Sequence, residues 1–119
     1  MKTKNWIPVL CTISLIFAAA CGKMSPDEVA VRLYEGMRDN NPKAIQANCT
    51  EAAASVYLLF APMAAKAMEG AQIKAIDTQV DGDIATVTIE ICEKDGRKRT
   101  EDLTLVKVKG VWKAAAKKQ

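Results

Sequence analysis

The period of the hydrophobic pattern changes once along the chain, at Gly70, and this change constrains the fold more than any other feature. After Gly70, apolar and polar residues alternate with a period of two, which predicts β-strands. The strand candidates are "IKAIDTQV" (73–80), "IATVTIEI" (84–91), "RTEDLTLVKV" (99–108) and "VWKAAAK" (111–117). Each connection is short and contains a glycine, so consecutive strands form hairpins. The sequence therefore predicts a four-stranded antiparallel sheet.

Before Gly70 the pattern is helical, and the first helix has clear start signals. The segment "SPDEVAVRLYEGMRD" opens with Ser25 as N-cap, Pro26 at the first helical position and Glu28 three residues after the cap. A shorter helix follows, capped by Asn41 and running to about Asn48. We therefore expect two consecutive helices before the central segment of the chain.

A third helix is predicted from Thr50, its cap, to Gly70, which ends it. Pro62 should kink or split this helix. Its segment "VYLLFAPM" (56–63) is apolar on nearly all sides, which favours a core helix enclosed by the sheet. Three helices followed by four antiparallel strands make an α+β domain.

The N-terminus has the order of an export signal. Lys2 and Lys4 precede an apolar stretch, and small residues occupy positions 18–20. The apolar stretch falls short of the ~20 residues that a transmembrane helix needs. Either of two peptidases could cut after Ala20. The ordinary signal peptidase accepts small residues there, whereas Cys21 at the first mature position looks like the lipobox of bacterial lipoproteins.

We favour the lipobox interpretation, although Ala18 stands where a leucine is commonest. The expected division is a lipoprotein signal peptide over 1–20, lipidated Cys21 with a short tether over 21–24, and an α+β domain over 25–119. Two or three acyl chains such as palmitate hold a protein stably on a bilayer. Gly22, rather than an aspartate, favours the outer membrane facing the periplasm. The membrane is then the first expected partner.

Two cysteines remain after lipidation, Cys49 and Cys92, and an exported protein lies where disulfides persist. We expect them to form a disulfide. The strand alternation leaves an alternative open, because Cys92 shares a face with Thr88 and Glu90 rather than with the core row. A bulge near the strand end would reconcile the two positions, and so would the absence of a bridge.

Charge is unevenly distributed along the chain. Residues 94–119 carry nine basic and three acidic side chains, whereas residues 21–93 are net acidic. The basic segment could meet anionic lipid headgroups. The simpler interpretation, which we favour, is that its lysines solvate the outer face and edge of the sheet. No nucleic acid is expected, because no aromatic residues alternate with these charges.

The chain resembles a family of small bacterial lipoproteins known only as a domain of unknown function. The resemblance rests on "AAAC", on "SPDEVAVRLYEGMRDNNPKAI", on "VDGDIATVTIEI" and on the ending "LTLVKVKGVWK". Those proteins are similar in fold to the nuclear transport factor 2-like and cystatin-like group. The resemblance implies a curved antiparallel sheet wrapped around the N-terminal helices to form a cone, and it brings no catalytic motif.

The chain contains no histidine, and this absence narrows the functions that it can have. Histidine is the commonest general base and metal ligand, so we expect no enzyme, no metal site and no cofactor. The alternative is an enzyme of the isomerase or dehydratase kind. Members of the fold group use an acid and a tyrosine in an apolar cone, which implies Tyr34, Tyr57, Asp77 and Glu90 as its only candidates.

The favoured function is a cell-envelope lipoprotein that acts as a non-enzymatic binding or scaffolding module. A lipid, a small apolar ligand or an envelope protein would be its partner. The candidate pocket residues are aromatic: Tyr34, Tyr57, Phe60 and Trp112. The segment "VYLLFAPM" (56–63) would line such a cavity. The competing interpretation is that a domain of this size needs the side chains of this segment for its core.

Overall fold

The computed structural model describes residues 23–116. The predicted signal peptide (1–20), the lipidation site Cys21 and the first part of the tether lie outside the described residues. The chain forms helices α2 (Pro26–Arg38), α3 (Pro42–Ala47) and α4 (Glu51–Ala67). Strands β1 (Gln72–Asp81), β2 (Ile84–Cys92), β3 (Lys98–Val108) and β4 (Val111–Ala114) follow. Helices followed by four strands confirm the predicted order of elements.

The caps predicted from the sequence set the starts of the helices. At α2 the Glu28 carboxylate accepts a hydrogen bond from the Ser25 backbone N–H at 3.0 Å. At α3 the Asn41 side chain accepts from the Ala44 N–H at 3.3 Å, and at α4 the Thr50 hydroxyl accepts from the Ala53 N–H at 3.2 Å. Each bond satisfies a backbone donor that has no partner within the helix.

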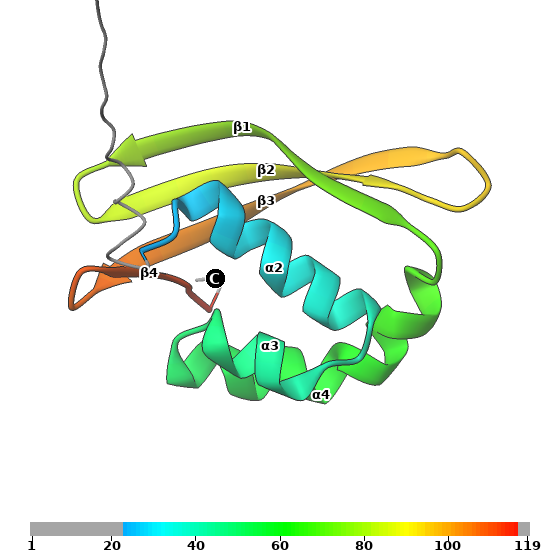
Figure 1. Ribbon diagram of the computed structural model, residues 1–119, viewed down its shortest axis with the longest axis horizontal. Helices are drawn as coiled ribbons and strands as arrows, with labels where there is room; N and C mark the ends of the chain where they lie inside the picture. The colour runs from blue at the N-terminus through cyan, green and yellow to red at the C-terminus, as the bar shows by residue number, and fades with distance from the viewer. Residues whose placement is uncertain (1–22, 117–119) are drawn as a thin grey trace, which may run out of the picture.

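The four strands form one antiparallel sheet in the order β1-β2-β3-β4 (Figure 1). A register shift between Ala75 and Asp77 leaves Ile76 as an extra residue in β1, and such bulges increase the local twist. At the other edge, β4 holds the segment between α3 and α4. The Ala114 N–H donates to the Asn48 carbonyl, and the Thr50 N–H donates to the Ala114 carbonyl. The predicted fold class, a curved four-stranded antiparallel sheet with N-terminal helices, is confirmed.

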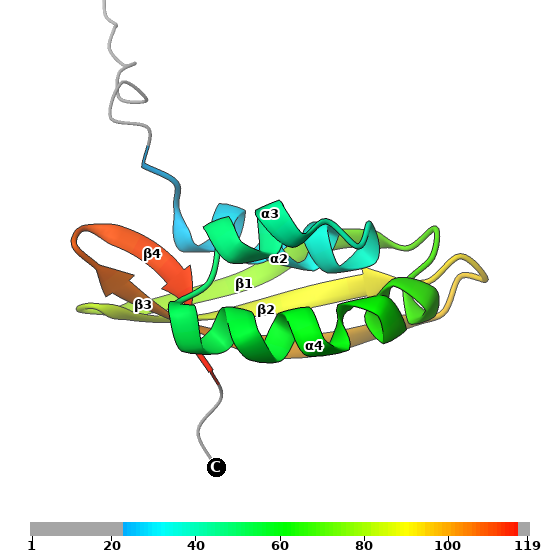
Figure 2. The ribbon, with the colours of Figure 1, turned by 90° about the horizontal axis from the view of Figure 1, so that it is seen from below.

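Helix α2 lies directly on the sheet and contacts all four strands, whereas α4 packs mainly on α2 and α3 (Figures 1 and 2). Alternate residues of β2 face α2. Val87, Ile89 and Ile91 belong to this row and are fully buried. Leu33 of α2 and Leu105 of β3 are also fully buried. The core therefore lies between α2 and the sheet.

The expectation that the segment 56–63 is enclosed by the sheet is wrong. Four of its apolar side chains are largely exposed on α4: Val56, Leu59, Phe60 and Met63. Helix α4 packs on its neighbours through the small side chains of Ala53, Ala54 and Ala61 instead. Small residues let helices approach closely, so the larger apolar residues face outward.

Pro62 does not split α4, which runs unbroken from Glu51 to Ala67. The proline lies on the exposed side of the helix. The Leu58 carbonyl, which loses its usual helical donor at a proline four residues later, can be hydrated there.

The expected disulfide is also wrong, because both Cys49 and Cys92 are free thiols. The backbone of Cys49 forms an isolated β-bridge with Ala114 of β4. Ala114 pairs with Leu105 of β3, and Leu105 pairs with Ala85 of β2. Cys92 lies seven residues further along β2, or about 23 Å at the usual rise of a strand. A disulfide needs Cα atoms within about 7 Å of each other. The curvature of the sheet does not bring the two ends of β2 together.

Candidate functional site

The strongest candidate site is a small cavity of about 150 Å³ between α2, α4 and β3. Its walls are partly apolar, and its polar groups come from two tyrosines and from one charged pair on β3. The lining residues are Tyr34, Met37, Tyr57, Ala64, Ala67, Met68, Arg99 and Glu101. Apolar walls with a few convergent polar groups are typical of ligand-binding sites.

The polar end of this cavity is built around the Tyr34 hydroxyl. Tyr34 is only 7% exposed, and its hydroxyl donates a hydrogen bond to Glu101 Oε1 at 2.8 Å. Arg99 Nη1 lies 3.2 Å from the second carboxylate oxygen of Glu101, and Arg99 Nε lies 3.3 Å from Glu93. The carboxylate is therefore held between a phenol and a guanidinium.

Burial and this hydrogen bond together affect the acidity of Tyr34. Burial raises the pKa of Tyr34 well above its ordinary range, and the bond to the Glu101 carboxylate raises the pKa further. Burial also raises the pKa of Tyr57 on the other side of the cavity. Both phenols stay protonated at neutral pH. Tyr34 uses its proton in the hydrogen bond to Glu101, so Tyr57 is the phenol that can donate a hydrogen bond to a bound molecule.

Cys49 is not a candidate nucleophile. Burial raises the pKa of its thiol to about 11. Because the thiolate is the reactive form of cysteine, a thiol of this pKa is almost entirely unreactive at neutral pH.

The structure brings together only two of the four aromatic residues predicted to line a pocket. Tyr34 and Tyr57 both line the cavity. Phe60 is half exposed on the outer side of α4, and Trp112 is buried elsewhere, with the Lys107 ammonium 5.1 Å from the centre of its ring. The cavity is therefore smaller and more polar than an aromatic pocket.

The carboxylates implied as catalytic partners lie away from the tyrosines. Glu90 has its Oε1 3.5 Å from the Lys74 ammonium. Asp77 pairs in register with Thr88, and its side chain accepts a hydrogen bond from Gln79. Neither lines the cavity, and the acid that the structure places beside Tyr34 is Glu101.

Sequence reasoning missed Arg99 and Glu101, although the strand pattern contains a signal for them. Along β3, residues 99, 101, 103 and 105 share one face of the strand. Leu103 and Leu105 of this row are buried in the core. Arg99 and Glu101 therefore point towards the helices as well, and charged residues in a core-facing row indicate a site.

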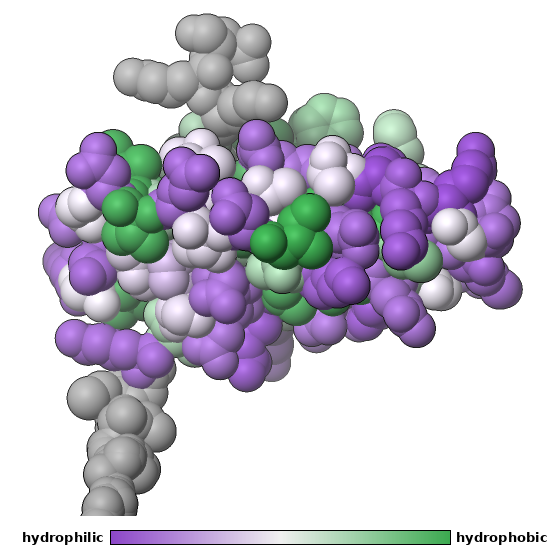
Figure 3. Space-filling view, turned by 90° about the horizontal axis from the view of Figure 1, so that it is seen from above, coloured by the Kyte–Doolittle hydropathy of each residue, from purple (hydrophilic) through white to green (hydrophobic). Residues whose placement is uncertain are grey.

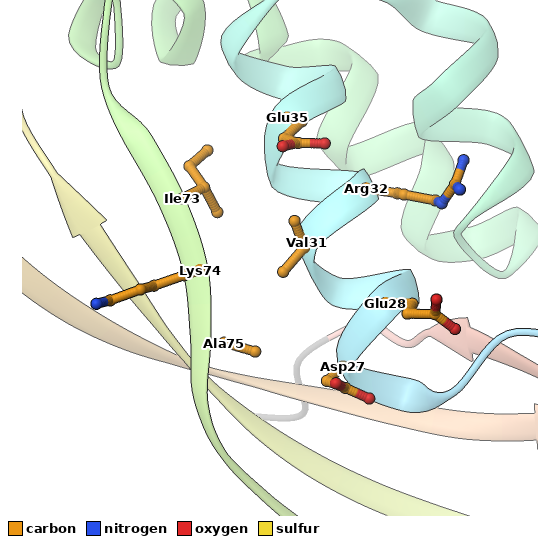
Figure 4. Close-up of a pocket in the computed structure, with 8 residues that line it drawn as sticks. All are labelled: Asp27, Glu28, Val31, Arg32, Glu35, Ile73, Lys74 and Ala75. Carbon is orange, nitrogen blue, oxygen red and sulfur yellow. The ribbon is translucent and has the colours of Figure 1, made fainter.

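A larger groove of about 530 Å³ lies between α2 and β1, but the polar groups that line it do not form a binding site. Figure 4 shows Val31 of α2 opposite Ile73 and Ala75 of β1, with Lys74 pointing away from the helix and Arg32 pointing away from β1. The charged groups do not converge on a common point. Within residues 23–116, no group of three or more potential ligands could hold a metal ion.

No helix among the described residues is long and apolar enough to cross a membrane.

Comparison with known proteins identifies the fold. No family model and no curated protein sequence matches the chain. Among solved structures, a protein from Campylobacter jejuni named provisionally as an NTF2-like transpeptidase has a TM-score of 0.70 at 13% identity, covering 79% of this chain and 100% of its own. An NTF2-like protein of unknown function from Shewanella baltica has a TM-score of 0.60 at 13% identity, covering 86% and 94%. The chain therefore has the nuclear transport factor 2-like fold.

The prediction that the protein is not an enzyme is contradicted by these similarities. Besides the Campylobacter jejuni protein, a protein from Sinorhizobium meliloti named provisionally as a polyketide cyclase matches with a TM-score of 0.51 at 17% identity, covering 74% of this chain and 92% of its own. The fold thus includes proteins that carry enzyme names. A missing histidine rules out histidine chemistry but not catalysis by a carboxylate and a tyrosine.

Proposed function

We propose that this protein is a lipid-anchored protein of the bacterial cell envelope whose domain binds a small amphipathic molecule between α2, α4 and β3. The observation that carries the binding proposal is the asymmetry of the cavity. Met37, Ala64 and Met68 provide an apolar end, and the Tyr34 and Glu101 pair provides a polar end. Such a site suits a molecule with one ring or a short chain and one polar group.

The anchoring part of the proposal is supported by the sequence at the N-terminus. Cys21 follows three alanines at the end of an apolar stretch, as in a lipobox. Only one residue separates Cys21 from Lys23, where the described domain begins. The binding site would therefore work close to a membrane surface.

We expect phenol to bind in this cavity more tightly than toluene, which has the same ring without a hydroxyl. The phenol hydroxyl can donate to the Glu101 carboxylate, whereas toluene leaves the polar end without a new partner. The measurement is a titration followed by NMR chemical shifts, in which the signals of Tyr57 and Ala64 should move. Replacing Ala64 with leucine fills the cavity and should remove binding of both probes.

The matched control is Ala52→Leu, on the exposed side of the same helix. This variant has the same change in side-chain volume and should bind both probes as the unmodified protein does. If Ala64→Leu binds phenol as well as Ala52→Leu does, the cavity is not the binding site.

Acid–base catalysis on the bound molecule is a second candidate function. It is favoured by the position of Glu101, whose carboxylate opens to the cavity while Tyr34 fixes one of its oxygens. Glu101 would take a proton from the carbon next to a carbonyl group, which leaves an enolate, and after exchange with solvent the carboxyl group would return a deuteron to that carbon. The Tyr34 hydroxyl would hold the carboxylate in place. Deuterium exchange at the carbon next to the carbonyl of cyclopentanone tests this. The unmodified protein should accelerate the exchange, and Glu101→Gln should abolish the acceleration.

A further inference from the structure

Two hairpin turns and the start of the described chain lie at one end of the sheet. The turns Gly82–Asp83 and Lys109–Gly110 join β1 to β2 and β3 to β4, so they project from the same end (Figure 1). The Lys23 ammonium lies against the second turn, 3.4 Å from the position that a Cβ atom on Gly110 would occupy. We call this end, with its two turns, the turn end.

The turn end carries most of the exposed aliphatic side chains of the sheet. Val80 and Ile84 flank the first turn with exposed fractions of 56% and 53%, and Val108 and Val111 flank the second with 43% and 39%. Among the described residues, the turn at the opposite end has no exposed large apolar side chain. Figure 3 shows hydrophobic atoms at the turn end and a hydrophilic surface at the opposite end.

Three of these aliphatic side chains lie on the outer face of the sheet, Ile84, Val108 and Val111, and Val80 lies on the face that carries the helices. Val80 pairs with Ala85, which is buried, so Val80 is on the face that carries the helices. Ile84 is the next residue to Ala85 in β2 and therefore lies on the outer face. A flat protein partner would cover one face only. The interfacial layer of a bilayer can surround the turn end and contact apolar groups on both of its faces.

Lysines lie around the second turn of the turn end. Among the ion pairs of the described residues, none involves Lys23, Lys107 or Lys109. Asp81 and Asp83 lie at the first turn, so the positive charge is concentrated at the second turn, beside Lys23. Lysine side chains can extend along an apolar surface and place their ammonium groups among lipid phosphates.

We propose that the turn end docks on the phospholipid surface of the membrane that holds Cys21, with Val108 and Val111 in the interfacial layer. This inference rests on the lipid anchor of the proposed function. Cys21 is two residues from Lys23, and two residues span at most about 7 Å. An acylated Cys21 would therefore keep the second turn at the bilayer surface, where even weak contacts persist because of the high local concentration.

The test compares the solvent access of single labels on the acylated protein. A small fluorophore is attached at Val111→Cys, Asp95→Cys or Leu59→Cys in a Cys49→Ala/Cys92→Ser background, and the protein is reconstituted in phosphatidylethanolamine and phosphatidylglycerol vesicles. Iodide should quench the label at position 111 about fivefold less than the label at position 95, because a charged quencher is excluded from apolar surroundings. Lipids carrying a nitroxide should quench mainly the label at position 111. Melting curves of each variant confirm that it is folded.

Each other outcome overturns the docking proposal in a recognisable way. Equal iodide quenching at positions 111 and 95, in protein that floats with the vesicles, refutes docking by the turn end and leaves the anchor intact. Protection at position 59 alone shows that α4 is the membrane-facing surface. Protein that does not float with the vesicles refutes the anchor, and the docking proposal falls with it.

Discussion

Replacing Cys21 with serine is expected to move the protein from the membrane fraction to the soluble fraction. The serine hydroxyl cannot receive the thioether-linked diacylglycerol, so the variant carries no acyl chain. Each buried methylene contributes ~0.8 kcal/mol to membrane binding, so the loss of two or three chains removes nearly all of it. Detergent-phase partitioning of cell extracts measures the change. Nearly all of the unmodified protein and almost none of the variant should enter the detergent phase.

The chain offers a matched control for this substitution in Cys11. This cysteine lies within the predicted signal peptide, so Cys11→Ser should leave the partitioning of the mature protein unchanged. A globomycin-treated culture should accumulate the uncut precursor of the unmodified protein. If Cys21→Ser still enters the detergent phase to the same extent as Cys11→Ser, the protein is held by something other than a lipid on Cys21.

The fold could be predicted from the sequence because short-range signals agreed with one another. The predicted strand 84–91 corresponds to β2 from Ile84 to Cys92, and the predicted caps Ser25, Asn41 and Thr50 all precede helices. Short turns containing glycine join only neighbouring antiparallel strands, so the topology had few alternatives. Where local preference, residue spacing and turn chemistry agree, the sequence is sufficient to predict the helices, the strands and their pairing.

The packing of α4 could not be predicted in the same way. Hydrophobicity identifies residues that prefer to be buried, but α4 buries the small residues Ala53, Ala54 and Ala61 and exposes Leu59 and Met63. The exposed fractions of Leu59 and Met63, 74% and 69%, depend on which side of the helix meets α2 and α3. That choice is made by three-dimensional packing and is not contained in the local pattern.

The candidate site was predicted in part, for a related reason. Tyr34 and Tyr57 stood out as tyrosines in apolar helices, but their acidic partner had to be found across 67 residues of sequence. Glu90 and Asp77, the acids that the resemblance implied, lie on β2 and β1 and do not line the cavity. The prediction of a disulfide between Cys49 and Cys92 was wrong because the number of cysteines does not determine how far apart they lie in the sheet.

Removing the carboxylate of Glu101 is expected to destabilise the protein by leaving a buried hydroxyl without its partner. In Glu101→Leu the Tyr34 hydroxyl, in a side chain that is 7% exposed, loses its acceptor, and an unsatisfied buried group costs about 1–3 kcal/mol. Tyr34→Phe removes the donor instead. Glu101 then keeps Arg99 and solvent, so the loss should be nearer 1 kcal/mol. Urea unfolding of both variants measures these free energies.

The double variant separates a specific pair from two independent effects. Tyr34→Phe/Glu101→Leu has no unsatisfied group, so its free energy of unfolding should be close to that of Tyr34→Phe alone. Tyr57→Phe is the control, because no hydrogen bond among residues 23–116 involves the Tyr57 hydroxyl. Additive losses in the double variant would show that Tyr34 and Glu101 do not interact in solution.

The same pair makes stability depend on pH in the alkaline range. Because the folded-state pKa of Tyr34 is raised above its ordinary value of 10.0, the folded protein holds this proton more tightly than the unfolded chain. The resulting stabilisation is fully present below pH 10 and is lost progressively as the pH rises above it.

Cys49 acts in the same direction between its ordinary pKa of 9.0 and about 11. Unfolding free energies should therefore fall above pH 9, and Tyr34→Phe should flatten the decline above pH 10 while Cys49→Ala flattens it between pH 9 and 11. A decline unchanged by both substitutions would assign it to other groups, such as Tyr57 on the other side of the cavity, whose pKa burial also raises.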